Sequence, residues 1–291
     1  QSGECRHQDA ALQKIVREAR VLLERVFSDL DLSDIHPRHG PGAVATKQLL
    51  WEKYLWTNVS GRIRLAFPLS SYFAASPNAF HYNIDRWKAI DDRDLPAQVV
   101  LVPKDSRGPR LISEEPVDFQ WIQQGLMRSI VDHVERHPLT RNNVRFTDQQ
   151  YNRRGALIGS SPVIYCRSGD PERPVRPAPL SEGRYATLDL KEASDRVSLD
   201  LVRLLFPEHV VNVLESARSS ATVLPNGEVL KLRKFAPMGS GLCFPVMALT
   251  IWALLTARTA DADTRECIFV YGDDVIVPVH FAREAMIVLE R

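Results

Sequence analysis

Three aspartates have the residue type and the positions that could support metal chemistry. Asp189 ends the stretch 184–190, "RYATLDL", which is predicted to be a strand. Asp273 and Asp274 stand at the turn of a predicted hairpin, 266–279, "ECIFVYGDDVIVPV". If the strand lies beside the hairpin, three carboxylates converge at one end of a sheet. Carboxylates in contact repel one another and resist leaving water, so such a cluster needs cations.

The cation that suits this donor set is Mg²⁺. It is a hard ion that keeps several waters, takes few protein ligands and completes its shell with phosphates. Two such ions would activate an attacking hydroxyl and stabilise a leaving pyrophosphate, and Mn²⁺ is the expected substitute. A simpler reading stays open, since Gly-Asp and Asp-Asp are common in turns and an aspartate at a strand end often caps the next helix.

The composition of the 291 residues is that of an ordinary globular protein, 44% hydrophobic and 25% charged. The net charge of +1 does not indicate a nucleic-acid partner, so a nucleic-acid enzyme would need local basic surfaces. The four cysteines lack CxxC spacing and the eight histidines lack HxH and HExxH spacing, so neither group is assigned to a metal. No apolar run reaches membrane-spanning length, and no membrane contact is expected.

Helices and strands alternate without a strict βαβ order, which favours an α+β layer arrangement. The segment 31–96 is expected to form short helices and loops, and 161–180, with five prolines, is expected to be largely loop. Hairpins are expected at Asn226-Gly227 and Gly272-Asp273. The other predicted helices are 11–27, 117–137, 198–206, 207–220 and 241–257, and the other predicted strands are 97–104 and 110–116.

Five ordered motifs resemble those of viral RNA-dependent RNA polymerases. "TLDLKEASDRVS", "APMGSGLCF" and "FVYGDDVIV" are similar to motifs A, B and C of the palm, in the form found in replicases of single-stranded RNA bacteriophages, the leviviruses and their relatives. "VPKDSRGPRLISEEP" resembles the basic finger motif of that family, and "TDQQYNRRGALIGS" resembles its segment before motif A. The resemblance runs from about Val102 to Pro278 and is to the replicase beta subunit.

This resemblance implies a right-hand polymerase fold with a palm, an antiparallel sheet with helices, and fingers. Residues 1–158 would hold the N-terminal region and finger elements, and 159–291 the catalytic palm core. We expect the chain to be a piece of a longer protein that is truncated after motif C and lacks the thumb.

The resemblance also implies roles for the acidic residues. Asp189 and Asp273 would bind the catalytic metals, and Asp274 would support that site. Asp195 would sense the ribose 2′-hydroxyl, and the small residues Ala193 and Ser194 leave room for that hydroxyl, which favours RNA as the product. A helix N-cap is the alternative for Asp195.

Motif B and the basic finger segment would contact the nucleotide. Gly239 would allow close backbone approach, and Ser240 would donate to a ribose hydroxyl. Relatives often have Asn at the position of Ser240, and Thr at that of Cys243, where a thiol is a weaker donor. Three cations spaced by three residues would bind the triphosphate, although a solvated basic loop is the alternative; they are Lys104, Arg107 and Arg110.

The segment 141–154, "RNNVRFTDQQYNRR", interleaves arginines with aromatic residues. Backbone contact and base stacking hold single-stranded nucleic acid in this way, so Arg145, Arg153 and Arg154 are predicted to bind RNA. The alternative is a helix start capped by Thr147 or Asp148.

The function implied is an RNA-directed RNA polymerase that replicates a viral genome by nucleotidyl transfer to a 3′-hydroxyl. Its partners would be an RNA template and product, ribonucleoside triphosphates and host proteins, in the cytoplasm of a bacterial host. Two alternatives remain open: a metal-dependent phosphodiesterase or nuclease that uses the same carboxylates, and an inactive polymerase fragment that binds RNA.

Overall fold

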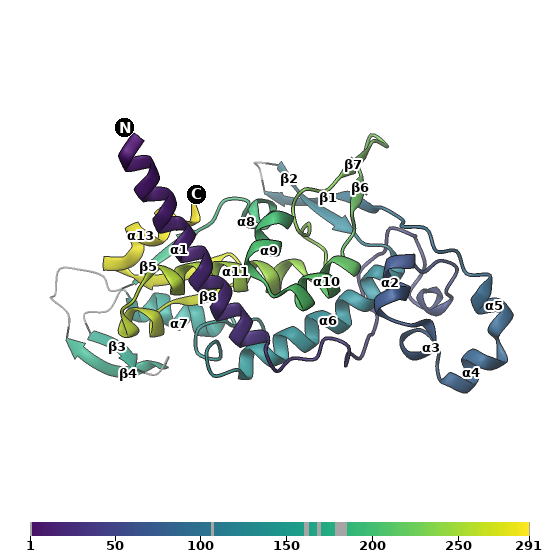
Figure 1. The fold of residues 1–291 in the computed structure, drawn as a ribbon, viewed down its shortest axis with the longest axis horizontal. Helices are drawn as coiled ribbons and strands as arrows, with labels where there is room; N and C mark the ends of the chain where they lie inside the picture. Colours follow the sequence, from purple (N-terminus) through teal and green to yellow (C-terminus); the bar gives the residue numbers. More distant parts are fainter. Residues whose placement is uncertain (1, 106–107, 160–162, 168–169, 178–184, 291) are drawn as a thin grey trace. The chain divides into compact units, whose positions relative to one another are not determined.

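The computed structural model describes residues 2–105, 108–159, 163–167, 170–177 and 185–290. The chain, drawn as a ribbon in Figure 1, forms two compact units. Unit 1 draws on 1–30, 130–207 and 245–291, and unit 2 on 31–129 and 208–244. Both units mix helices with strands, as expected for an α+β chain. The expected division into finger elements (1–158) and palm core (159–291) stays a prediction. The compact units are defined by contacts between residues, and contacts do not assign a functional role to a segment.

Unit 1 contains a three-stranded antiparallel sheet with the strand order β5-β9-β8. The strands are β5 (Tyr185–Asp189), β8 (Phe269–Tyr271) and β9 (Asp274–Pro278). The strand predicted at 184–190 and the hairpin predicted at Gly272-Asp273 are therefore confirmed. β9 is the central strand, and its residues 275–278 are all buried, as a continuous apolar run predicts.

Helices of unit 1 pack on this sheet. α7 (Gln150–Gly159) contacts all three strands, and α13 (Val279–Leu289) contacts β5 and β9. α11 (Cys243–Arg258) is apolar on every side and buried along nearly its whole length, and Pro245 is tolerated because it lies in the first turn. The remaining helices of the unit are α1 (Ser2–Phe27), α8 (Ala193–Arg196), α9 (Leu199–Leu205) and α12 (Ala262–Glu266).

The prediction of a loop at 161–180 is wrong for the part that the structure describes. β3 (Val163–Arg167) pairs antiparallel with β4 (Asp170–Pro177), and the register shifts twice along the ladder. Both strands of a two-stranded sheet are edges, so a proline can turn its missing N–H away from the partner. The proline count therefore argued against a central strand but not against this hairpin.

Unit 2 contains a four-stranded mixed sheet with the order β2-β1-β6-β7, in which β1 and β6 run parallel. The predicted hairpin at Asn226-Gly227 and the strands predicted at 97–104 and 110–116 are confirmed. The strands are β1 (Ala97–Asp105), β2 (Gly108–Glu114), β6 (Ala221–Val223) and β7 (Val229–Lys231). The helices are η1 (Glu52–Tyr54), α2 (Gly61–Ala66), α3 (Leu69–Tyr72), α4 (Pro77–Tyr82), α5 (Ile84–Lys88) and α10 (Glu208–Ser216), and α6 (Val117–Arg136) begins here and continues into unit 1.

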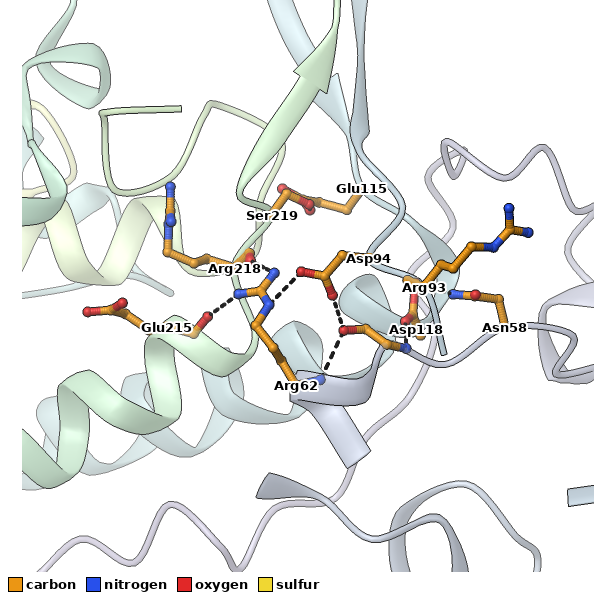
Figure 2. A network of polar contacts seen from close by, with 10 residues as sticks. Asn58, Arg62, Arg93, Asp94, Glu115, Asp118, Glu215, Arg218 and Ser219 are labelled. Carbon is orange, nitrogen blue, oxygen red and sulfur yellow. Dashed lines mark hydrogen bonds and ion pairs between the residues drawn. The ribbon is translucent and has the colours of Figure 1, made fainter. Parts of the chain in front are cut away.

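A polar network joins the separate segments of unit 2 (Figure 2). Arg62 donates from Nε to Asp94 Oδ2 at 2.6 Å and from Nη1 to the carbonyl oxygen of Glu215 at 2.8 Å. Asp118 Oδ2 accepts from the backbone N–H of Ser60 at 2.8 Å. The network ties 60–62 to 94, to the start of α6 and to the end of α10.

Across the described residues, each helix is too short or too polar to span a bilayer.

Candidate active site

The end of the β5–β9 ladder brings two of the predicted aspartates face to face. Asp189 is the register partner of Asp274, at the last paired position of the two strands. Directly opposed residues point to the same face of the sheet, with Cβ atoms about 4.5–5.5 Å apart. Both side chains are exposed. The expectation that the strand ending at Asp189 lies beside the hairpin is confirmed.

The third aspartate lies in the turn that joins β8 to β9. Tyr271 pairs with Asp274, which leaves only Gly272 and Asp273 in the loop. Gly272 has φ +63°, a left-handed value that the first central residue of so tight a hairpin requires. The glycine makes the turn, and exposed Asp273 adjoins the facing pair.

The helix-cap alternatives for Asp189 and Asp195 are wrong. The residue before α8 is Glu192, which has φ +54° and makes no side-chain cap. The cap of α9 is Ser198, whose hydroxyl oxygen accepts from the N–H of Leu201 at 3.0 Å. Asp195 lies inside α8 with an exposed side chain. Neither aspartate is held in place by a capping role.

The donor set fits Mg²⁺ in its chemistry. Asp189, Asp273 and Asp274 offer only carboxylate oxygens, and no Lys or Arg of the described chain forms an ion pair with them. Their ligand atoms do not all lie within 4.8 Å of one another in the described structure, so they do not form a closed cage. An open set of oxygens suits an ion that keeps waters and takes phosphate oxygens from a substrate.

A cavity of about 270 Å³ adjoins the facing aspartates, between α7 and the β5–β9 pair. Asp189 and Asp274 line it together with Arg153, which was predicted to bind RNA. Asn152 lines it as well; it is 5% exposed and donates from Nδ2 to the carbonyl oxygen of Asp274 at 3.0 Å. Asn152 was not among the site residues predicted from the sequence, although it lies within the motif at 147–160.

The other arginines of that segment are placed differently. Arg145 donates its backbone N–H to Val270 at 3.0 Å, and so adds an isolated bridge to the edge of β8. The side chain of Arg154 lies outside the described residues. Asp148 Oδ1 accepts from the N–H of Gln150 at 2.9 Å, so the alternative of a capped helix start holds for Asp148. That cap is compatible with a place for Arg153 beside the aspartates.

The motif B residues belong to unit 2, where backbone geometry fixes them. Gly239 has φ +112°, and a Cβ there would lie 2.2 Å from the carbonyl oxygen of Ser113 in β2. The hydroxyl of Ser240 is buried and donates to Gln123 Oε1 at 3.0 Å, and the N–H of Gly241 donates to the same oxygen at 3.1 Å. The loop is thus fastened to β2 and α6. Gln123 was not predicted from the sequence, because no local pattern gives a signal for it.

Known proteins resemble the chain over these same elements. The family model described as RNA replicase, beta-chain, matches residues 180–291, which include β5, the motif B loop and the β8–β9 hairpin. The RNA-directed RNA polymerase subunit beta of Qbeta virus (strain MX1) is 29% identical over 251 residues, or 84% of this chain. The corresponding subunit of Escherichia virus Qbeta is 32% identical over 209 residues, or 71% of this chain. The chain belongs to the RNA replicase beta-chain family.

The chain spans about a third of the length of the curated relatives that it matches. It covers 36% of the strain MX1 protein, 30% of the Escherichia virus Qbeta protein and 29% of the RNA-directed RNA polymerase beta chain of Escherichia phage MS2, to which it is 28% identical over 184 residues. The resemblance drawn from the five motifs is confirmed as a family relation.

The segment 102–116, predicted to be the basic finger motif, is described only in part. It forms the β1–β2 hairpin of unit 2, in which Arg110 is exposed and pairs with Val102. Arg107 and the side chain of Lys104 lie outside the described residues. The structure thus brings Asp189, Asp274 and Arg153 together in unit 1, while triphosphate binding by the basic segment stays a prediction.

Proposed function

We propose that this chain carries the catalytic centre of an RNA-directed RNA polymerase that replicates a viral RNA genome. The observation that carries the proposal is the register of Asp189 opposite Asp274, with Asp273 in the adjoining turn. A strand end and a tight hairpin bring three acidic side chains to one end of the β5-β9-β8 sheet. The family relation supports the same reading.

Asp189, Asp273 and Asp274 would hold two Mg²⁺ ions, for which Mn²⁺ would substitute. When bound, these ions would favour the attack of a 3′-hydroxyl on the α-phosphate of a nucleotide and the departure of pyrophosphate. The turn and the ladder pre-position the carboxylates. Arg153, on the wall of the adjoining cavity, supplies positive charge for a phosphate group of the RNA.

Selection and delivery of the nucleotide rest on the other predicted residues. Asp195 would accept a hydrogen bond from the ribose 2′-hydroxyl, and a deoxyribose would leave this acceptor unpaired, at a cost of ~1–3 kcal/mol if the site is closed to water. Gly239 and Ser240 would shape the nucleotide site. Lys104, Arg107 and Arg110 would neutralise the triphosphate, with Arg145 and Arg154 on the RNA.

In this proposal the β5-β9-β8 sheet with its helices is the palm and the β1–β2 hairpin belongs to the fingers. The enzyme works on an RNA template in the cytoplasm of a bacterial host, together with host proteins. The names of the relatives, which are polymerase subunits of bacterial viruses, support this setting.

The test compares incorporation of labelled ribonucleotides and deoxyribonucleotides on a primed RNA with Mg²⁺. It is run on the full-length protein and on residues 1–291. Ribonucleotide-selective extension by the full-length protein, lost in Asp273→Asn and kept in the exposed control Asp200→Asn, supports the proposal. Degradation of the RNA without extension would replace it with the nuclease reading, and RNA binding with neither reaction would leave an inactive RNA-binding protein.

A further inference from the structure

A second group of metal-binding residue types lies in unit 1, and it does not belong to the aspartate site. Asp29 follows the end of α1, His133 lies in the last turn of α6, and His137 directly follows the end of α6. One ligand atom from each of the three lies within 4.8 Å of the other two. No other trio of His, Cys, Asp or Glu in the described residues meets this condition. None of the three lines the cavity beside Asp189.

One measured distance within this trio suits a tetrahedral ion, and the other two are within 4.8 Å. Ligand atoms bound to zinc at about 2.0–2.2 Å are about 3.4 Å from one another in a tetrahedron. His133 Nε2 lies 3.6 Å from Asp29 Oδ1, close to that separation. The two imidazole rings lie with centroids 5.3 Å apart and planes inclined at 42°, so the rings are tilted and not stacked face to face.

The end of α1 adds negative potential at the same place. His133 Nε2 lies 2.6 Å from the carbonyl oxygen of Val26, in the last turn of α1. Carbonyl groups in the last turn of a helix lack partners within the helix and carry the negative end of its dipole. A cation beside His133 would therefore face a carboxylate, two imidazoles and a helix C-terminus.

We propose that Asp29, His133 and His137 form a binding site for one divalent transition-metal ion of the zinc class. Each histidine contributes a nitrogen lone pair, Asp29 contributes one carboxylate oxygen, and water fills the fourth position. If Nε2 is the ligand atom of each histidine, its proton moves to Nδ1, with no net release of a proton. His133 then gives up its hydrogen bond to the carbonyl oxygen of Val26, and His137 gives up the bond that its Nδ1 accepts from the N–H of Leu139 at 3.2 Å. The ion would tie the C-terminus of α1 to α6.

The chemistry separates this site from the aspartates. Two imidazoles and one carboxylate select zinc-class ions, whereas Mg²⁺ prefers a shell of oxygen atoms. No histidine was assigned to a metal from the sequence, because the eight histidines lack HxH and HExxH spacing. The spacing of four residues between His133 and His137, which puts both on one side at the end of α6, is the signal in the sequence that points to this pair.

The test titrates metal-free full-length protein with Co²⁺ in a buffer that contains excess Mg²⁺. We expect one equivalent of Co²⁺ to give the visible absorption of a tetrahedral site, and Zn²⁺ to displace it and to raise Tm. Asp29→Asn and His137→Gln should each weaken Co²⁺ binding roughly tenfold or more. His81→Gln, an exposed histidine outside the trio, is the matched control and should bind normally.

Two outcomes would overturn the proposal. One is the absence of the Co²⁺ absorption in protein with a native circular dichroism spectrum. The other is unchanged Co²⁺ affinity in Asp29→Asn, whose exposed side chain can be altered without disturbing the fold. If the histidines only cap α1, His133→Gln lowers Tm by the same amount with and without Zn²⁺. An Asp189→Asn/Asp273→Asn double variant that retains the Co²⁺ spectrum shows that the polymerase site is not the source, whatever becomes of the proposed polymerase activity.

Discussion

Two regions of this protein place pairs of carboxylates in opposite environments. At the end of the β5–β9 ladder, Asp189 and Asp274 face each other and are both exposed to solvent. At the junction of β2 and α6 in unit 2, Glu115 and Asp118 are 2% and 0% exposed. We call these regions the ladder end and the β2–α6 junction. The same chemical group is displayed to solvent in the first and enclosed in the second.

The partners of the two pairs differ in the same way. At the β2–α6 junction, Glu115 accepts from the hydroxyl of Ser219 and Asp118 accepts from the N–H of Ser60 (Figure 2). Burial raises the pKa of Glu115 to about 7 and that of Asp118 to about 6. At the ladder end, no basic side chain of the described residues neutralises the pair. The enclosed carboxylates are satisfied by protein donors, whereas the exposed pair depends on solvent or on the Mg²⁺ ions of the proposed function.

The largest expected effect tests the ladder end. Asp273→Asn should reduce nucleotide incorporation at least roughly 10²–10³-fold, the loss typical when one electrostatic stabiliser is removed from a catalytic site. Tm should stay equal or rise, because the substitution relieves repulsion among like charges. Primed-RNA extension and thermal unfolding are measured together. The comparison fails if Asp273→Asn lowers Tm by several degrees, since the aspartate would then support the fold.

The next effect tests how tightly the β2–α6 junction holds motif B. Gly239→Ala should cost more than about 3 kcal/mol in free energy of unfolding, because a methyl group 2.2 Å from the carbonyl oxygen of Ser113 adds a clash to the strain of φ +112°. Gly227→Ala is the matched control: its φ is +88° but nothing lies within 4 Å, so about 1–2 kcal/mol is expected. Equal costs for the two variants in urea unfolding would contradict the contact with β2.

The third effect is a pH dependence at the β2–α6 junction. The pKa of Glu115 is about 7 in the folded protein, against 4.5 for the ordinary group, because burial outweighs the opposing effects of Ser219 and Arg218. Between these two values the folded state binds the proton and the unfolded state does not, so stability falls as pH rises through this window. Glu115→Gln removes the penalty and should be more stable than wild type by up to about 3 kcal/mol at pH 8, with little difference near pH 4.5.

Urea unfolding across this pH range measures the effect on Glu115→Gln. The exposed Glu228→Gln gives the same chemical change outside the core and should show no such trend. A difference between Glu115→Gln and wild type that does not vary with pH would mean that Glu115 keeps its charge when buried. The contrast between the two regions would then be one of exposure alone.

Local chemistry made much of the ladder end predictable from the sequence. Strand alternation, the glycine of the Gly272-Asp273 turn and the acidic residues at the strand ends all act over a few positions. The register that pairs Asp189 with Asp274 depends on residues 85 positions apart. The sequence predicted that these carboxylates converge only if the strand lies beside the hairpin, and it gave no evidence that it does. The prediction of a loop at 161–180 was wrong because the number of prolines does not distinguish an edge strand from a loop.

The β2–α6 junction shows what the sequence could not supply. Glu114 and Glu115 are neighbours of the same type, yet Glu114 forms an ion pair with Lys47 at 2.7 Å while Glu115 is enclosed. A strand turns successive side chains to opposite faces, but which face is covered depends on segments far away in the chain. Likewise, the need for glycine at 239 comes from Ser113, a contact that no local pattern encodes.

The smallest expected effect concerns the backbone of the ladder end, where the carbonyl oxygen of Asp274 accepts a hydrogen bond from buried Asn152. Asn152→Ala removes the bond from Nδ2 to the carbonyl oxygen of Asp274 and should cost about 1–2 kcal/mol in free energy of unfolding. Looser placement of Asp274 should also raise the Mg²⁺ concentration needed for half-maximal incorporation. Gln149→Ala, an exposed residue lining the same cavity, is the control and should change neither quantity. If Asn152→Ala lowers stability and leaves the Mg²⁺ requirement unchanged, Asn152 supports the packing of α7 on the sheet and does not position the carboxylate.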